Sequence, residues 1–343
     1  MNTAALLNTL TSRCRTLPIV VLYVTEACNL RCISCSYRAA PPGELTLDEI
    51  AALARSLMAG GLRHIVFSGG EPLTRRDFPD ICALFARGSV RQTLLTNGLL
   101  LEKRFSEISP FLDEFIVSLD GADAATHDAI RGARSFERIV QGIRLLARAG
   151  RGRDVAIRTV VQKRNFRSLP AMVAHARALG AGRVSFLAAD VRSAGFGRDE
   201  RGPSAAPETM TLDRGEAGEL HRIVEGMERD SAALFAEGFI DQSPTRLHGI
   251  ASYYEALNGI APFPPVLCNA PMVSTVITSR GDLLPCYFLP PAGNVRRGEI
   301  GTLLNGDDLR RTRGRVRART QPECASCVCT LHVGPVSALA GRF

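Results

Sequence analysis

The chain has 343 residues, of which 45% are hydrophobic and 22% are charged. This length fits one barrel-sized domain or two ordinary ones, and the composition supplies a substantial core, which excludes a disordered protein. The formal net charge is +8, and Lys103 and Lys163 are the only lysines, so arginine supplies nearly all of the basic residues. The arginines are spread along the chain, Trp is absent, and no basic run alternates with aromatic residues, which disfavours nucleic-acid binding.

Short β-branched runs alternate with helical stretches between residues 18 and 190. We predict strands at 19–24, 64–68, 92–96, 115–119, 155–161 and 183–188. We predict helices at 46–59, 77–86, 104–108, 136–149 and 168–179, the first opened by a capping box of Thr46 and Glu49. Six βα repeats predict a parallel sheet with right-handed crossovers, so we expect an α/β protein with a partial (β/α)6 TIM barrel over residues 1–190. The chemistry of such a barrel lies at the carboxyl ends of its strands.

The pattern changes after residue 190. Residues 193–209 are rich in Gly, Pro, Ser and Ala and predict a mobile loop, and 212–236 predict a helix, within a linking region that we place at 191–262. A hairpin is expected at 274–278 and 283–288, and a basic helix at 307–319. The uncharged stretch 256–279 is long enough to cross a bilayer but contains four prolines, so we interpret it as a linker and a strand. With no targeting signal at the start of the chain, we expect a cytoplasmic protein whose thiols stay reduced.

Cys28, Cys32 and Cys35 form a C-x3-C-x2-C group directly after the first predicted strand. Three thiolates on one loop can bind three irons of a cubane cluster and leave the fourth iron open to a ligand. The alternatives are a zinc site and three incidental thiols. Zinc normally takes a fourth protein ligand, and the first histidine of the chain, His64, is distant in sequence.

This motif resembles the signature of the radical S-adenosylmethionine (SAM) superfamily. A second motif of that superfamily, Gly69-Gly70-Glu71-Pro72, follows the second predicted strand, and the resemblance covers residues 18 to 190. It implies that the open iron chelates SAM, that an external donor such as flavodoxin or ferredoxin supplies the electron, and that cleavage yields a 5'-deoxyadenosyl radical. We expect the two glycines to let the backbone approach the ligand and Glu71 to accept hydrogen bonds from its ammonium group.

Further polar residues at strand ends fall where the superfamily contacts SAM. Thr96 and Asn97 end the third predicted strand, and Ser118 and Asp120 lie at the end of the fourth. The resemblance implies that these residues reach the ribose and methionyl groups of SAM.

Two arginines are candidates for the SAM carboxylate. Arg158 lies on the fifth predicted strand and Arg131 in a His-Asp-Ala-Ile-Arg-Gly segment, and for each the alternative is a structural ion pair. One departure concerns the adenine. The superfamily usually places an aromatic residue just before the third cysteine, whereas this chain has Ser34 there, and Tyr37 is the nearest candidate to replace it.

Five more cysteines lie in the last eighty residues. They are Cys268, Cys286, Cys324, Cys327 and Cys329. The spacing of the first two, with a glycine five residues before the second, resembles the SPASM and twitch extensions that follow radical SAM barrels. We expect the first four to close one auxiliary [4Fe–4S] cluster in a twitch-type extension at 263–343, because five cysteines are too few for the two clusters of a full SPASM domain. A structural zinc is the alternative, and Cys329 is the alternative to Cys327 as fourth ligand.

The small extension and the composition typical of a GC-rich genome favour a sugar-containing small molecule of secondary metabolism as the substrate. The length and single-cluster architecture are most similar to the cytosylglucuronate decarboxylases of antibiotic biosynthesis, which implies a lyase that decarboxylates a nucleoside uronate. Sugar dehydrogenases or epimerases, and ribosomal-peptide maturases, are the alternatives. Few residues precede the first strand, which disfavours a maturase with its own peptide-recognition domain. Asp190, Arg192 and Arg198 either help to bind the substrate or are simply solvated.

Overall fold

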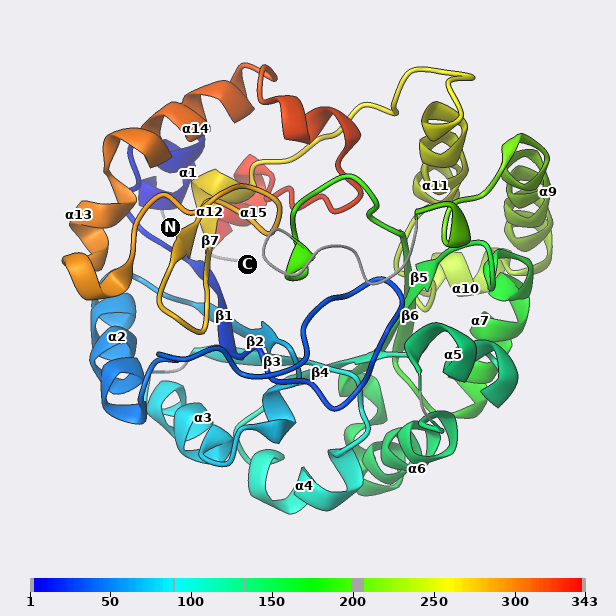
Figure 1. The fold of residues 1–343 in the computed structure, drawn as a ribbon, viewed down its shortest axis with the longest axis horizontal. Helices are drawn as coiled ribbons and strands as arrows, with labels where there is room; N and C mark the ends of the chain where they lie inside the picture. The colour runs from blue at the N-terminus through cyan, green and yellow to red at the C-terminus, as the bar shows by residue number, and fades with distance from the viewer. Residues whose placement is uncertain (1–2, 89, 133, 199–206, 341–343) are drawn as a thin grey trace.

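A computed structural model of the chain describes residues 3–88, 90–132, 134–198 and 207–340. Its strands form one sheet in the order β6-β5-β4-β3-β2-β1-β7-β8 (Figure 1). All pairs from β6 to β7 are parallel, and β7 and β8 are antiparallel. The predicted partial (β/α)6 barrel is confirmed by β1 to β6. In the described part of the chain, no helix combines the length and the apolar character that a membrane crossing requires.

The strands and helices of the barrel lie close to their predicted positions. The strands are β1 (Ile19–Thr25), β2 (His64–Gly69), β3 (Arg91–Thr96), β4 (Glu114–Ser118), β5 (Val155–Val161) and β6 (Arg183–Ala188). The outer helices are α2 (Leu47–Ala59), α3 (Phe78–Ala86), α4 (Leu101–Ile108), α6 (Phe136–Leu146) and α7 (Leu169–Ala178). The capping box at the start of α2 is present. Helix α6 is shorter than predicted because its last turn widens into a π-turn over Ala147–Arg151, within which Gly150 has φ 77°.

One helix of the barrel was not predicted. Helix α5 (Ala124–Arg131) lies between β4 and α6, and Asp123 caps it by accepting a hydrogen bond from the Thr126 backbone N–H. It has eight residues with only His127 and Ile130 buried, so its sequence lacks the apolar stripe that would reveal it.

The C-terminal part contains short helices and a hairpin. Its elements are α9 (Arg214–Asp230), α10 (Ala232–Ala236), α11 (Pro244–Leu257), α12 (Ala270–Val273), β7 (Ser274–Ile277), β8 (Leu283–Leu284), α13 (Ile300–Leu304), α14 (Asp307–Arg317) and α15 (Pro335–Ala340), with α1 (Thr3–Leu10) packed against α12 and α15. The helix predicted at 212–236 is broken at Ser231, whose backbone is not helical. The predicted loop at 193–209 falls partly outside the described residues, at 199–206.

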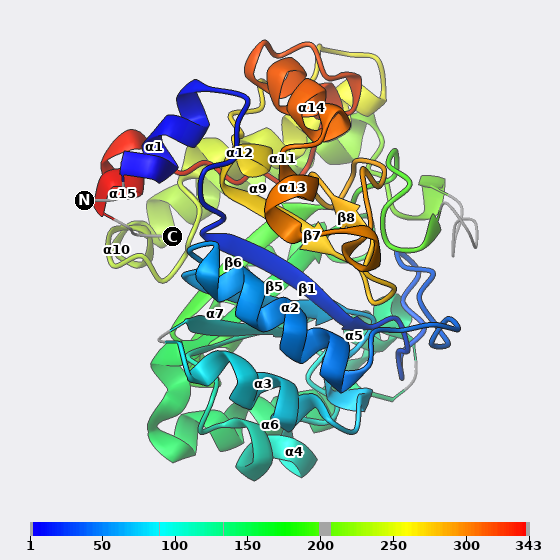
Figure 2. The same ribbon diagram turned by 90° about the vertical axis from the view of Figure 1, so that its left-hand side faces the viewer.

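The hairpin does not form a separate layer. Strand β7 pairs in parallel with β1, with Val21 opposite Val276, so the C-terminal part extends the barrel's own sheet. Figure 2 shows β7 and β8 beside β1, with α13 and α14 next to them.

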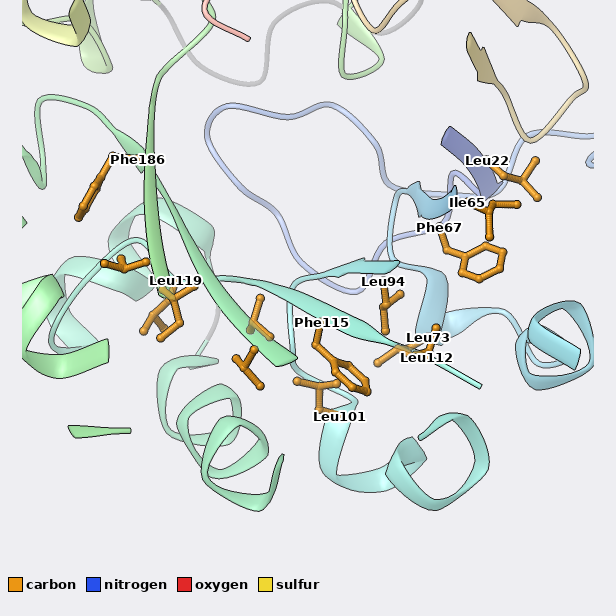
Figure 3. Close-up of a cluster of buried hydrophobic side chains, with 14 of the residues drawn as sticks. Leu22, Ile65, Phe67, Leu73, Leu94, Leu101, Leu112, Phe115, Leu119 and Phe186 are labelled. Carbon is orange, nitrogen blue, oxygen red and sulfur yellow. The ribbon is translucent and has the colours of Figure 1, made fainter. Parts of the chain in front are cut away.

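Alternate residues of each strand face opposite sides of the sheet. Leu22, Phe67, Leu94 and Phe115 are buried and belong to the core between the strands and the outer helices (Figure 3). Their neighbours along the strands therefore point into the barrel. Several of these inward residues are polar, among them Ser118, Arg158 and Ser185, which lie in one row across β4, β5 and β6.

Two adjacent tyrosines of α11 differ in their hydrogen bonding. The Tyr254 hydroxyl donates to Val161 O at 2.6 Å and accepts from Ala189 N at 3.0 Å, so it joins α11 to the ends of β5 and β6. The Tyr253 hydroxyl is also buried but makes no hydrogen bond within the part of the chain that the structure describes.

Replacing Tyr254 by Phe should lower the free energy of unfolding by about 1 kcal/mol, because both hydrogen bonds of the hydroxyl are lost while Ala189 N keeps its own bond to Val161 O. Tyr253→Phe is the matched control, and it should leave stability unchanged or raise it. Both can be measured by urea denaturation of the anaerobically prepared protein. Equal losses in the two variants would contradict this account.

Candidate functional site

The loop after β1 carries the first three cysteines, and the end of α5 holds it in place. Arg31 N donates to Arg131 O at 3.2 Å and Ile33 N donates to Ile130 O at 3.0 Å. Helix α5 ends at Gly132, which has φ 72°, and a Cβ there would lie 2.9 Å from Arg31 O. The unpaired carbonyl groups at the end of a short helix thus accept hydrogen bonds from the cysteine loop.

Two of the three sulfur atoms have a nitrogen donor beside them. Asn97 Nδ2 lies 3.8 Å from Cys28 Sγ, and Arg131 Nη1 lies 4.0 Å from Cys32 Sγ. Such donors offset the negative charge of thiolates that bind a metal, so this set of three soft ligands fits an iron–sulfur cluster. Burial, and next the neighbouring Cys32, raise the pKa of Cys35 to about 11, so the metal-free thiol is neutral at pH 7.

The Glu71 carboxylate is fully buried and is bound by the ends of two strands. It accepts hydrogen bonds from Leu73 N at 3.0 Å, Thr96 Oγ1 at 2.8 Å and Asn97 N at 2.7 Å. Burial raises the pKa of Glu71 to about 7, although these hydrogen bonds oppose the rise. Glu71 therefore fixes the position of Asn97, whose side chain reaches Cys28.

Gly69 and Gly70 are needed for a close approach between two backbone segments. A Cβ on Gly69 would lie 2.1 Å from Thr25 O, and one on Gly70 would lie 2.3 Å from Ala27 O. Gly70 N and Glu71 N donate to the same two carbonyl groups, each at 2.8 Å. We expected these glycines to let the backbone approach a ligand. In the structure, they let the backbone approach the segment that leads into Cys28.

Arg131 is anchored by Asp120. Arg131 Nε donates to Asp120 Oδ2 at 2.7 Å, and the two side chains are 12% and 2% exposed. Burial alone would lower the pKa of Arg131, but Asp120 and then Cys32 outweigh it and raise the pKa. The other carboxylate oxygen of Asp120 accepts from Val160 N at 2.7 Å, which ties β4 to β5. The ion pair that we gave as the alternative for Arg131 is present, and the guanidinium still faces Cys32.

Ser118 and Arg158 lie side by side on neighbouring strands, and Ser185 is the next partner in the row. Ser185 is buried, while the other two are partly buried. The structure therefore places Arg158 in the barrel interior, on a different strand from the Asp120–Arg131 pair.

Three tyrosines fill the space between the two cysteine groups. The rings of Tyr37 and Tyr287 lie 6.2 and 6.3 Å from the ring of Tyr23, measured between centroids. Burial raises the pKa of Tyr23, and the other two tyrosines, Cys35 and Cys286 raise it further, so Tyr23 lies near cysteines of both groups. Tyr37 is buried in this cluster, and no motif in the sequence pointed to Tyr23 or Tyr287.

The five C-terminal cysteines come together around the hairpin. Burial raises the pKa of Cys286 to about 12, and Cys324 and Cys268 raise it further. Burial also raises the pKa of Cys327, and Cys329, Cys268 and Cys286 add to the rise. Ala270 N donates to Cys268 Sγ at 3.4 Å. This cluster of soft ligands fits an iron–sulfur centre. Within the described ranges, no three Cys, His, Asp or Glu side chains are close enough to hold a single metal ion.

Two charged residues of the loop after β6, Asp190 and Arg198, are paired with each other. Both side chains of this ion pair are largely buried. Arg192 lies over the Phe263 ring, 5.2 Å from its centroid. Asp190 and Arg198 are therefore neither solvated nor free for a substrate, contrary to both interpretations of the sequence. The loop also contacts the first cysteine loop, because Ser36 N donates to Phe196 O at 2.9 Å.

Comparison with known proteins identifies two domains. The radical SAM superfamily model matches residues 22–175, and the model of the iron–sulfur cluster-binding SPASM domain matches residues 268–328. These domains imply a [4Fe–4S] cluster, SAM and auxiliary iron–sulfur binding.

Several relatives match part of the chain. The AdoMet-dependent heme synthase of Methanosarcina barkeri is 36% identical over 169 residues, which is 48% of each chain. The mycofactocin maturase MftC of Mycobacterium ulcerans is 29% identical over 272 residues, or 77% of this chain and 67% of that one. This chain spans about half the length of the first of these relatives.

Solved structures share the fold over most of the chain. SuiB of Streptococcus suis bound to the precursor peptide SuiA has a TM-score of 0.65 and 18% identity, covering 96% of this chain and 74% of SuiB. The enzyme anSMEcpe with bound AdoMet and a peptide has a TM-score of 0.64 and 17% identity, covering 91% of this chain and 86% of that one. The two domain matches show that the chain belongs to the radical SAM superfamily and carries a C-terminal SPASM domain.

Proposed function

We propose that this enzyme abstracts a hydrogen atom from a sugar carbon of a carboxylate-bearing small molecule, with decarboxylation of a nucleoside uronate such as cytosylglucuronate as the reaction. The observation that carries the radical chemistry is the loop of Cys28, Cys32 and Cys35, held at the carboxyl ends of the strands with nitrogen donors at two sulfur atoms. When bound, the cluster and SAM supply a 5'-deoxyadenosyl radical.

The residues of the chain have separate tasks in this proposal. Cys28, Cys32 and Cys35 hold the cluster. Asn97 and Arg131 stand beside it and orient the methionyl part of SAM, each positioned by a buried carboxylate. Gly69 and Gly70 set the distance between the strand end and the cysteine loop. Ser118 lies in the barrel interior, where it can reach the ribose.

The auxiliary centre is proposed to be one [4Fe–4S] cluster bound by Cys268, Cys286, Cys324 and Cys327. Cys327 is favoured over Cys329 because it forms a C-x2-C pair with Cys324. We divide the chain at 1–190, 191–262 and 263–343, although the sheet continues from the first part into the third.

Peptide maturation is the second candidate function. It is favoured by MftC, a maturase that this chain matches over 77% of its own length. The structures with bound peptides show a shared fold alone, because their identity is below 25%.

Anaerobic assays with SAM and dithionite separate the candidates. Cytosylglucuronate should release carbon dioxide in step with 5'-deoxyadenosine, and turnover of a precursor peptide instead would overturn the sugar proposal.

Changing Cys28, Cys32 and Cys35 to Ala should abolish the formation of 5'-deoxyadenosine, because no other described cysteine lies on this loop to hold the SAM-binding cluster. The product can be quantified by chromatography after anaerobic incubation with SAM and dithionite. Cys14→Ser is the control, since Cys14 lies outside both groups and should leave SAM cleavage intact. Retained cleavage in the triple variant would refute the assignment.

The auxiliary cysteines make a separate prediction about iron. The reconstituted protein should bind about eight irons per chain, as expected for two [4Fe–4S] clusters. Cys327→Ala should lower the count to about four, while Cys329→Ala should leave it near eight. Metal analysis by mass spectrometry measures both. A wild-type count near four with bound zinc would rule out the auxiliary cluster, and the reverse pattern between the variants would make Cys329 the ligand.

A further inference from the structure

Arg158 is a cation inside the barrel that no carboxylate of the described chain neutralises. It lies on β5 between Ser118 of β4 and Ser185 of β6 in the strand register. Residues paired in register on parallel strands face the same side of the sheet. Ile157 and Val161, which face the other side, belong to the core under the outer helices. The Arg158 side chain therefore points inward at the carboxyl half of the barrel.

Its hydrogen bonding is incomplete. Arg158 Nε donates to Ser185 Oγ at 3.3 Å, a long contact to a neutral group. Among the described residues, neither Nη atom has a protein acceptor, and no Asp or Glu lies within ion-pair distance of the guanidinium. A partly buried arginine usually gains such a partner, since its fork of N–H groups matches a carboxylate.

Several other buried or partly buried arginines have a carboxylate or carbonyl acceptor. Arg75, Arg104, Arg131, Arg183 and Arg198 each form an ion pair with a carboxylate. Arg313 is buried and donates to the carbonyl groups of three residues, Ser12, Pro271 and Leu304. Arg158 departs from this pattern, at the carboxyl half of the barrel.

The surroundings of Arg158 also separate it from the first cysteine loop. Burial and then Cys329 raise the pKa of Tyr287, while the charge of Arg158 lowers it. Burial likewise raises the pKa of Cys329, and the charge of Arg158 opposes this rise. The charges that act on Arg131 come instead from Asp120, Cys32 and Cys35. Arg131 therefore faces the first cysteine loop, with Nη1 4.0 Å from Cys32 Sγ, whereas Arg158 lies near Tyr287 and Cys329 of the C-terminal part.

We propose that Arg158 binds the carboxylate of the substrate and that Arg131, not Arg158, serves the carboxylate of SAM. This inference rests on the proposed function and names the chemical class that the site selects, an organic acid whose carboxylate lies between β5 and Tyr287. The guanidinium then holds the acid by paired, charge-assisted hydrogen bonds. Arg158 is a substrate-binding residue in this account.

Equilibrium binding without reductant tests the proposal in the reconstituted, SAM-loaded protein. Arg158→Gln should weaken binding of cytosylglucuronate by about 10- to 100-fold, the loss expected for hydrogen bonds to a charged group. Binding of glucosylcytosine, the neutral analogue with a hydroxymethyl group, should not change. Arg158→Lys should recover part of the loss. Arg153→Gln, an exposed arginine just before the same strand, is the matched control and should behave as wild type.

Two further readouts identify the ways in which the proposal fails. If Arg158→Gln weakens SAM binding as much as cytosylglucuronate binding, Arg158 serves SAM and the inference is wrong. If the variant loses auxiliary iron, Arg158 supports the metal centre instead. If the wild type binds no cytosylglucuronate, the proposed substrate is wrong. Comparing the binding of D-glucuronate with that of D-glucose, which lacks the carboxylate, then tests Arg158 by itself. The inference holds if the wild type binds D-glucuronate and Arg158→Gln loses this binding. The inference is wrong if the wild type does not bind D-glucuronate.

Discussion

The buried ion pair between Asp120 and Arg131 is the interaction on which the first cysteine site depends. It joins four parts of the molecule, because Asp120 follows β4 and accepts from β5, while Arg131 ends α5 and faces Cys32. Removing one partner of such a pair leaves an uncompensated buried charge, which typically costs several kcal/mol. The carbonyl groups at the end of α5 accept from the cysteine loop, so the loop would lose its support together with the ion pair.

Glu71 positions a nitrogen donor on one side of the first cysteine loop, as Asp120 does on the other side. It binds the backbone of Asn97, whose side-chain nitrogen reaches Cys28, just as Asp120 binds Arg131, which reaches Cys32. In each case a buried carboxylate orients a nitrogen donor toward a sulfur atom. Donors fixed in this way keep their direction whether or not a metal is bound, which is how outer residues tune a metal site.

The barrel could be predicted from the sequence because its strands are short β-branched runs separated by amphipathic helices. Helix α5 could not, because it buries too few apolar residues to show a period of 3.6. Cysteine spacing predicted the first group, whose three thiols share one loop, and the resemblance to SPASM and twitch extensions grouped Cys268 and Cys286 with Cys324 and Cys327. Contacts between residues that are far apart in the sequence leave no pattern of this kind. The parallel contact of β7 with β1, the ion pair of Asp190 with Arg198, and Tyr23 beside Tyr287 all depend on the folded chain.

The contact of β7 with β1 also decides how the two cysteine groups relate to each other. Strand β1 leads directly into the first cysteine loop, and β7 begins soon after Cys268. Because these strands pair over four residues and Tyr23 packs between Tyr37 and Tyr287, the separation of the two groups is set by a sheet and by buried rings. A flexible linker would let that separation vary, and electron transfer between two metal centres would vary with it. Here the extension cannot move away without breaking the strand pairing and exposing the tyrosines, so the sequence boundary near residue 263 is not a hinge.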